Sequence, residues 1–239
     1  MNFAIIAAGE GSRLAAGGIN VPKPLVQLCG VPLIDRLTDI LVKNGASSIS
    51  VIVNEQNTKT VTHLQGKSLP VPLNLVIKTT SGSMHSLYEL SPFLKGADFC
   101  LMTVDTVFCK NDFADYIADF RRSTKYDGLM AVTDFIDDES PLYAGVDDHL
   151  NITGYYDVPQ DDSRYISGGI YCLRNTALNV LEKVMKQGMT RMRDFQRQMV
   201  AAGLKLKAFP FPKIVDIDHP EDIKTAEEFL YNSSICNKT

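Results

Sequence analysis

Short apolar runs alternate with amphipathic stretches along the first half of the chain. The apolar runs predict β-strands over residues 3–8, 48–53, 73–77, 98–104 and 128–133. Apolar residues at helical spacing predict amphipathic helices over residues 33–45, 84–94 and 111–122. Alternation of strands and helices implies right-handed β-α-β units. We therefore expect an α/β protein with a Rossmann-like three-layer α/β/α fold and a mostly parallel mixed sheet.

The pattern changes after residue 133. Residues 134–164 are rich in Asp, Gly and Tyr and contain two short strand candidates, at 143–147 and 151–157. We interpret this stretch as an insertion beside a ligand site and not as a domain of its own. The prediction is therefore one domain that spans residues 1–239.

The last third of the chain returns to clear elements. We expect a strand at 165–173, helices near 175–187 and 190–202, a strand at 204–210 and a final helix after Asp218. Asp218 is followed three residues later by Glu221, a pattern that is typical of a helix N-terminus, and Pro220 fits the first turn. We therefore assign Asp218 to the N-cap of the final helix.

The strongest local signal is a glycine-rich turn directly after the first strand. Such a turn at the carboxyl end of a parallel strand exposes backbone N–H groups that bind phosphate oxygens. Arg13 adds a forked donor, and Lys23, between two prolines, adds a point charge. The dinucleotide-binding fingerprint and the Walker A motif are both incomplete here. We expect these residues to contact nucleotide phosphates: Ala7, Ala8, Gly9, Gly11, Ser12 and Arg13.

Two aspartates end apolar runs. Asp105 follows the strand at 98–104, and Asp216 follows the apolar run before the final helix. The carboxyl ends of strands in an open α/β sheet form the edge where ligands bind. Two carboxylates at that edge can hold one Mg²⁺ against phosphate oxygens. The alternative for Asp105 is a solvent-exposed loop residue.

These motifs together resemble those of the sugar-1-phosphate nucleotidylyltransferase family, which includes related small cytidylyltransferases. The resemblance rests on A-A-G-x-G-S-R-L followed by P-K-P-L, on Ser167–Tyr171, and on the ending V-D-I-D-H-P-E-D over residues 215–222. It implies a nucleotide-diphospho-sugar transferase-like fold. It also implies transfer of an NMP from an NTP to a phosphorylated acceptor, first of all a sugar 1-phosphate, with release of pyrophosphate.

The same resemblance assigns roles to single residues. Arg13 would bind the leaving pyrophosphate, and Lys23 would bind the α-phosphate and the acceptor phosphate. Mg²⁺, the expected cofactor, would lie on Asp105 and Asp216, and Asp105 would also contact the nucleotide. The segment after the third strand would contact the base through Ser81, Gly82, Ser83 and Ser86. An N-cap formed by Ser81 or Ser83 is the alternative for that segment.

The residues expected to bind the acceptor match the pattern of the family only in part. The resemblance places acceptor hydroxyls at Gly168 and Gly169, for which a β-bulge is the alternative. Sugar-specific relatives often carry Glu-Lys-Pro before this strand, and the comparable stretch here lacks both the acid and the lysine. We expect Asp157 to substitute for the acid. Tyr155 and Tyr156 form either a buried strand or an aromatic box for a quaternary ammonium group.

Three other functions are open at this stage. One is a cytidylyltransferase for phosphocholine or another small phosphate or phosphonate. Another is a glycosyltransferase, because residues 216–218 have D-x-D form, but that motif belongs after a mid-chain strand. The third is a non-catalytic, nucleotide-binding regulatory protein. The presence of Arg13, Lys23, Asp105 and Asp216 argues against the third.

The composition of the chain excludes some classes of binding partner and of cellular location. The 239 residues carry a net charge of −4, which argues against nucleic acid or an anionic membrane as the main partner. The first residues lack the basic region of a signal peptide, and no apolar run reaches the ~18 residues of a membrane span. The 5 cysteines form no C-x-x-C pair, which favours reduced thiols. We expect a cytoplasmic protein, not inserted in a membrane, whose partners are an NTP and a small phosphorylated acceptor. The sequence predicts no oligomeric state.

Overall fold

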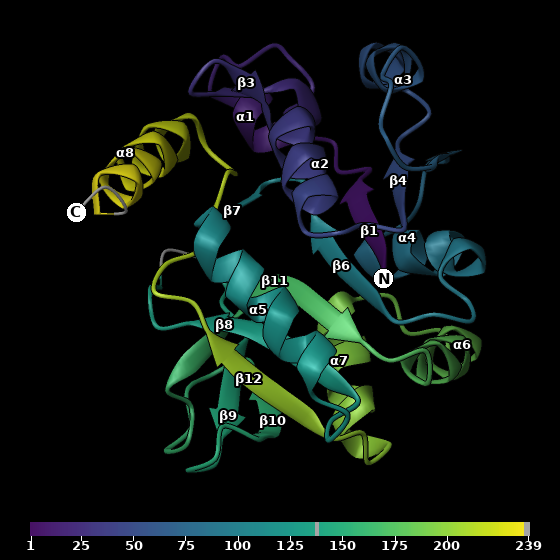
Figure 1. The fold of residues 1–239 in the computed structure, drawn as a ribbon, viewed down its shortest axis with the longest axis vertical. Helices are drawn as coiled ribbons and strands as arrows, with labels where there is room; N and C mark the ends of the chain where they lie inside the picture. The colour runs from purple at the N-terminus through teal and green to yellow at the C-terminus, as the bar shows by residue number, and fades with distance from the viewer. Residues whose placement is uncertain (137–138, 237–239) are drawn as a thin grey trace.

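A computed structural model describes residues 1–136 and 139–236 of the chain. Its centre is a nine-stranded sheet with helices on both faces (Figure 1). The strands of this sheet are β1 (Asn2–Ala7), β4 (Ser48–Val53), β5 (Leu73–Ile77), β6 (Phe99–Thr103), β8 (Gly128–Thr133), β9 (Tyr143–Val146), β10 (Ile152–Tyr156), β11 (Tyr165–Leu173) and β12 (Leu206–Pro210). The expected Rossmann-like three-layer α/β/α fold with a mixed sheet is confirmed.

The order of the strands separates the sheet into two halves. The main path is β10-β9-β11-β6-β1-β4-β5, with β8 paired to β11 and β12 paired to β8. From β6 to β5 all neighbours are parallel. By contrast, β11 runs antiparallel to β6, β8 and β9. Strands of the parallel half are apolar on both faces because helices cover both of them.

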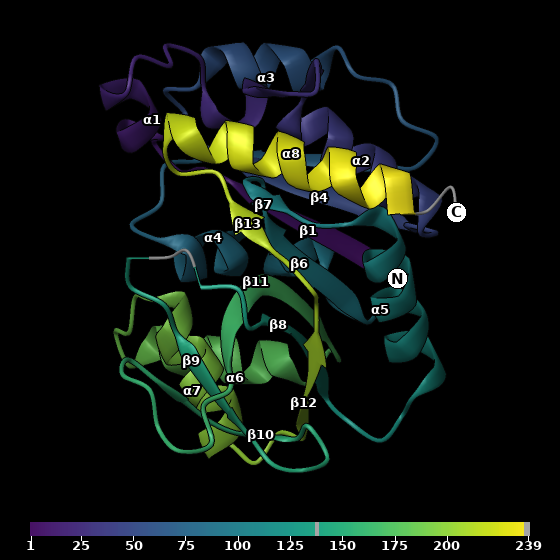
Figure 2. The ribbon, with the colours of Figure 1, turned by 90° about the vertical axis from the view of Figure 1, so that its left-hand side faces the viewer.

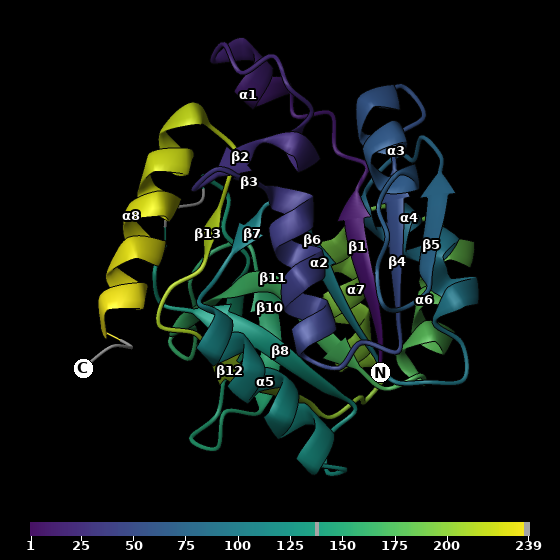
Figure 3. The ribbon, with the colours of Figure 1, turned by 45° about the horizontal axis from the view of Figure 1, so that its top comes forward.

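The helices divide between the two faces of the sheet. They are α1 (Ser12–Ala16), α2 (Leu33–Lys43), α3 (Thr58–Gln65), α4 (Ser83–Leu90), α5 (Lys110–Arg122), α6 (Ala177–Lys186), α7 (Met192–Ala201) and α8 (Pro220–Cys236). Alternate residues of β1 point to opposite faces. Phe3 and Ile5 pack with α2, α5 and α8, whereas Ala4 and Ile6 pack with α4, α6 and α7. Figure 3 shows α2 and α5 in front of the sheet and α6 and α7 behind it.

The stretch predicted as an insertion, 134–164, contains β9 and β10. These strands extend the antiparallel half and lie at the opposite end of the molecule from α1 and α3 (Figures 1 and 2). Residues 137–138, inside this stretch, lie outside the described residues. None of the helices in the described part of the chain is long and apolar enough to cross a bilayer.

Several small elements were not predicted. These are α1, α3, the 3-10 turns η1 (Lys23–Leu25) and η2 (Ser91–Phe93), the hairpin of β2 (Gln27–Leu28) and β3 (Val31–Pro32), and the pair of β7 (Thr106–Val107) and β13 (Val215–Asp216). The last pair matters for the site. It is antiparallel, with Asp216 opposite Thr106, and so connects the end of β6 to the start of α8.

Candidate active site

A cleft of about 390 Å³ opens at the carboxyl ends of β1 and β6, and we call it the loop cleft. Its walls are the glycine-rich loop after β1, the segment 79–83 with the start of α4, and the end of β6. The residues predicted to contact the nucleotide that line it are Ala7, Ala8, Gly9, Gly11, Ser81, Gly82, Ser83, Ser86 and Asp105. Lys23 lines it as well. Of the remaining two, Ser12 begins α1, and Arg13 lines a neighbouring cavity.

Gly11 has a left-handed backbone conformation, with φ of 65°, immediately before α1. This conformation favours glycine because a Cβ would be strained there. A Cβ on Gly11 would also lie 3.4 Å from the Cβ of Lys23. The glycine therefore allows the loop to turn tightly beside Lys23.

The opposite wall of the loop cleft is made of small polar residues. Gly82 occupies the N-cap position of α4, so the alternative of an N-cap by Ser81 or Ser83 is wrong. The hydroxyl groups of Thr80 and Ser86 lie 2.7 Å apart and join the segment to the helix. Backbone groups on a wall without bulky side chains can read the edge of a planar ring.

Lys23 is the best-buried charged group of the site, with 9% of its side chain exposed. Its Nζ donates to Asp105 Oδ2 at 2.5 Å and to Asp218 Oδ1 at 2.7 Å. Burial acts to lower the pKa of Lys23, but the two carboxylates outweigh it and raise the pKa above its usual value. Lys23 is therefore a fixed ammonium group between two acids.

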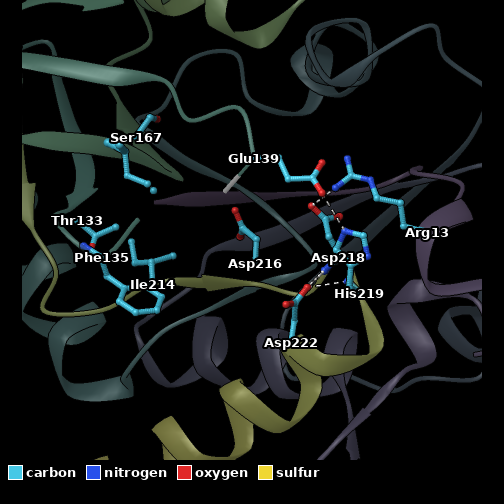
Figure 4. A pocket seen from close by; sticks show the side chains of 12 residues that line it. Arg13, Thr133, Phe135, Glu139, Ser167, Ile214, Asp216, Asp218, His219 and Asp222 are labelled. Carbon is cyan, nitrogen blue, oxygen red and sulfur yellow. Dashed lines mark hydrogen bonds and ion pairs between the residues drawn. The ribbon is translucent and has the colours of Figure 1, made fainter. Parts of the chain in front are cut away.

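Asp218 does not act as the predicted helix N-cap, and that assignment is wrong. Its second carboxylate oxygen accepts from Arg13 Nη1 at 3.0 Å (Figure 4). Both oxygens of Asp218 therefore contact cations. Asp222, in the first turn of α8, accepts instead from the backbone N–H groups of Asp218 and His219, which precede the helix, at 2.9 and 2.6 Å. Burial acts to raise the pKa of Asp218, but Lys23 and Arg13 lower it overall.

Asp216 completes a group of three carboxylates. The pairing of β13 with β7 sets it opposite Thr106 and hence next to Asp105. Asp216 is exposed to solvent, yet enough protein atoms surround it to desolvate its carboxylate in part. This desolvation first, and repulsion by Asp105 and Asp218 second, raise the pKa of Asp216 to about 7. The site thus concentrates more negative charge than Lys23 neutralises.

Such an excess of oxygen ligands suits a hard divalent cation. In the described residues, no group of three or more His, Cys, Asp or Glu side chains encloses one metal position. Mg²⁺ is usually held in proteins by one or two carboxylates plus waters and substrate phosphates. Asp105 and Asp216 fit that requirement, with phosphate oxygens of a ligand completing the shell.

A second cavity of about 510 Å³ joins the loop cleft at Asp105 and Ser81–Ser83, and we call it the arginine cavity. Gly169 lines it, and its φ of 73° coincides with an irregular register of β11. Gly169 therefore lies at a β-bulge and lines the cavity at the same time. Gly168 lines a small adjoining cavity, where a Cβ would collide with Ile214.

The other predicted acceptor residue, Asp157, is not among the residues that line these cavities. Its carboxylate binds Arg193 at 2.5 Å and Arg197 at 2.7 Å. The cations that line the arginine cavity are Arg191 and Arg193, which the sequence analysis missed. The signal was the pair of arginines in T-R-M-R, just before and within the first turn of α7.

Tyr155 is buried in the core beside β10 and β11, which confirms the interpretation as a buried strand. Only 5% of the residue is exposed. An aromatic box built on Tyr155 is therefore excluded. Its neighbour Tyr156 covers Gly154, where a Cβ would lie 2.5 Å from the tyrosine hydroxyl.

Comparison with curated proteins gives relatives over nearly the whole chain. The bifunctional protein GlmU of Methanococcus maripaludis is 25% identical over 98% of this chain and 56% of its own length. UTP–glucose-1-phosphate uridylyltransferase AglF of Haloferax volcanii is 25% identical over 96% of both chains. The chain therefore spans about half the length of GlmU and nearly all of AglF.

Solved structures share the fold. The inositol-1-phosphate CTP transferase from T. maritima superposes with a TM-score of 0.77 at 18% identity, over 97% of this chain and 95% of that one. A Bacillus anthracis protein, described provisionally as a glucose-1-phosphate thymidylyltransferase, reaches 0.83 at 18% identity over 96% and 95%. A family model described as nucleotidyl transferase matches residues 4–233. The chain belongs to the nucleotidyl transferase family, as its motifs predicted.

Proposed function

We propose that this chain is a metal-dependent nucleotidyltransferase that transfers an NMP from an NTP to a sugar 1-phosphate and releases pyrophosphate. One observation carries the proposal. Lys23 lines the loop cleft, and its ammonium group is paired with Asp105, which lines both cavities, and with Asp218, which lines the arginine cavity. A nucleotide in the first and an acceptor in the second would therefore meet at one ammonium group.

In the proposed reaction, an oxygen of the acceptor phosphate attacks the α-phosphorus of the NTP. A bond forms between that oxygen and the α-phosphorus while the bond to the β-phosphate oxygen breaks, and pyrophosphate leaves in line. A phosphate monoester is already ionised near neutral pH, so no general base is required. Catalysis then depends on positioning and on neutralising charge. Lys23 can do both by contacting the α-phosphate and the acceptor phosphate.

The glycine-rich loop and Arg13 would hold the other end of the triphosphate. Backbone N–H groups of residues 8–12 can bind β- and γ-phosphate oxygens. Arg13 is half exposed and paired with Asp218, and it can exchange that carboxylate for the departing pyrophosphate. A bound Mg²⁺, on Asp105 and Asp216, would offset the negative charge shared by the two phosphates.

The relatives support the acceptor class by their names. AglF is a glucose-1-phosphate uridylyltransferase, and the T. maritima protein acts on inositol 1-phosphate. Both acceptors are phosphorylated rings that carry hydroxyl groups. The phosphocholine alternative loses its structural basis because Tyr155 is part of the core.

Pyrophosphate release tests the proposal. The common NTPs would be crossed with hexose 1-phosphates, inositol 1-phosphate and phosphocholine, with Mg²⁺ and with excess EDTA. We expect release with one NTP and one ring phosphate, and none in EDTA. Absence of release from every pair, with an NTP still raising the melting temperature, would contradict catalysis and favour a regulatory nucleotide-binding protein.

A further inference from the structure

Gln196 is a polar residue in a position where α7 otherwise buries apolar side chains. It is 2% exposed, and its buried neighbours on the helix are Phe195 and Met199. Burying an amide costs free energy unless the amide is hydrogen-bonded. A methionine or leucine would fill the same space without that cost, so packing alone does not account for a glutamine here.

The amide joins two hydroxyl groups on β11. Ser167 Oγ donates to Gln196 Oε1 at 3.0 Å, and Gln196 Nε2 donates to the Tyr171 hydroxyl at 3.3 Å. Ser167 also lies within hydrogen-bonding reach of Tyr171. All three residues line the arginine cavity, and we call them the polar floor.

The polar floor has hydrogen-bonding capacity left over. An amide nitrogen carries two protons, and a hydroxyl oxygen offers two lone pairs as well as one proton. The internal bonds of the polar floor use only some of these groups. The three residues line a cavity that also reaches Asp105, so one ligand can touch both the reacting end and the polar floor.

We propose that Gln196 is a specificity-determining residue, which with Ser167 and Tyr171 binds a ring hydroxyl of the acceptor. This rests on the proposed function, because it takes the arginine cavity to be the acceptor site. The acceptor class it selects is a phosphorylated sugar or cyclic polyol with a hydroxyl at that point. A deoxy analogue or a choline group would leave the donors and acceptors that the polar floor does not use internally without partners.

Discrimination of this kind can be large. A site built to bind a hydroxyl rejects the analogue that lacks it, because buried polar groups are then left unpaired. An apolar pocket, in contrast, distinguishes a hydroxyl from a hydrogen only weakly. Replacing Gln196 with an apolar residue should therefore abolish the discrimination while leaving the nucleotide side intact.

The test compares Gln196→Met with Gln198→Met. The second makes the same substitution on α7 at a partly exposed residue that does not line either cavity. kcat and KM would be measured for the best ring phosphate and each of its monodeoxy forms. We expect the wild type to disfavour one deoxy form on the order of 10²-fold or more in kcat/KM. Gln196→Met should reduce that ratio below about tenfold, raise the acceptor KM and leave the NTP KM unchanged, whereas Gln198→Met should match the wild type.

Tyr171→Phe provides an independent variant that keeps the amide. It should weaken discrimination at the same ring position, and adding Gln196→Met should cause little further loss, because both substitutions act on one hydrogen-bonded group. Melting temperatures would show that each variant is folded, and calorimetry would measure acceptor binding apart from turnover. Unchanged discrimination in Gln196→Met, or additive losses in the double variant, would overturn the role of Gln196 and leave the transferase proposal intact. No binding and no release with any acceptor would overturn both.

Discussion

At the scale of single residues, the site is organised around Lys23, which contacts Asp105 and Asp218 at the same time. The ammonium group is held in place before any ligand arrives, so no free energy is needed to order it during the reaction. Its removal would also leave three carboxylates facing the phosphates. The chemistry therefore depends more on Lys23 than on Arg13, whose side chain is half exposed.

We expect Lys23→Ala to reduce turnover by on the order of 10²-fold or more, because a preorganised charge at the reacting phosphates is lost. Steady-state pyrophosphate release would measure this. Lys78→Ala is the matched control, since Lys78 is exposed, pairs with Glu89 and is not among the residues that line the cleft. A Lys23→Ala protein with near-normal turnover would refute the assignment.

Asp216 predicts a dependence of stability on pH. Its pKa is raised from 3.8 to about 7, so the folded protein binds this proton more tightly than the unfolded chain does. The stability contributed by Asp216 therefore falls as the pH rises between these two values. Without divalent cations, the melting temperature of the wild type should decline relative to Asp216→Asn from pH 4.5 to 7.5. Parallel curves for the two proteins would contradict the shift.

Residue-scale roles were only partly predictable. The glycine-rich loop, Lys23 and the two metal-site candidates lie in short patterns with a physical reason for their spacing, and the structure brings them to two adjoining cavities. Asp218 was misassigned because a local capping pattern does not reveal a cation that comes from residue 23. Gln196 gave no signal, since a glutamine in an amphipathic helix is usually exposed.

At the scale of elements, predictions from the hydrophobic pattern agree best with buried strands. The bounds of β4, β5, β8 and β11 match the predicted ranges. Continuous apolar runs define these strands because both faces of the sheet are covered. The helix α3 was missed because its eight residues include three threonines, and the apolar residues that it packs against the core are only Val61 and Leu64. The two-residue strands β7 and β13 depend on a pairing between distant segments, which no local pattern encodes.

The hydroxyl group of Tyr116 connects α5 to the sheet and should contribute to the free energy of unfolding. Its hydroxyl donates to the Leu129 carbonyl at 2.5 Å and accepts from the Cys172 amide at 2.8 Å, and so joins the helix to β8 and β11. Tyr116→Phe leaves two buried backbone groups without this partner, so we expect a loss of about 2 kcal/mol in the free energy of unfolding. Urea denaturation would measure it, with exposed Tyr88→Phe as the control. Equal midpoints for both variants would count against this role.

At the scale of the whole molecule, the loop cleft is built from segments that are far apart in the sequence. It is lined by residues 6–11, 23–24, 54, 79–83, 86 and 103–105. A ligand that touches every wall binds the folded chain and not the unfolded one, so it must stabilise the entire fold.

An NTP with Mg²⁺ at 100 times its Kd should therefore stabilise the protein by about 2.7 kcal/mol. For a chain of this size that corresponds to a rise of roughly 5–10 °C in melting temperature. Thermal denaturation followed by circular dichroism would measure the rise. Excess EDTA should remove most of it, because Asp105 and Asp216 would then repel the triphosphate. A rise that is insensitive to EDTA would contradict the role of the cation.

The position of β11 has a consequence for how this protein can change. It pairs with β8 along one edge and, along the other edge, with β6 at residues 170–173 and with β9 at residues 165–166, so it is the seam between the parallel and antiparallel halves of the sheet. The loop cleft lies largely on one side of this seam, and residues 140–196 supply most of the arginine cavity on the other. The two halves can thus diverge at different rates. Evolution, or the design of a chimaeric protein, can therefore replace residues 140–196 and keep the half of the sheet that forms the loop cleft unchanged.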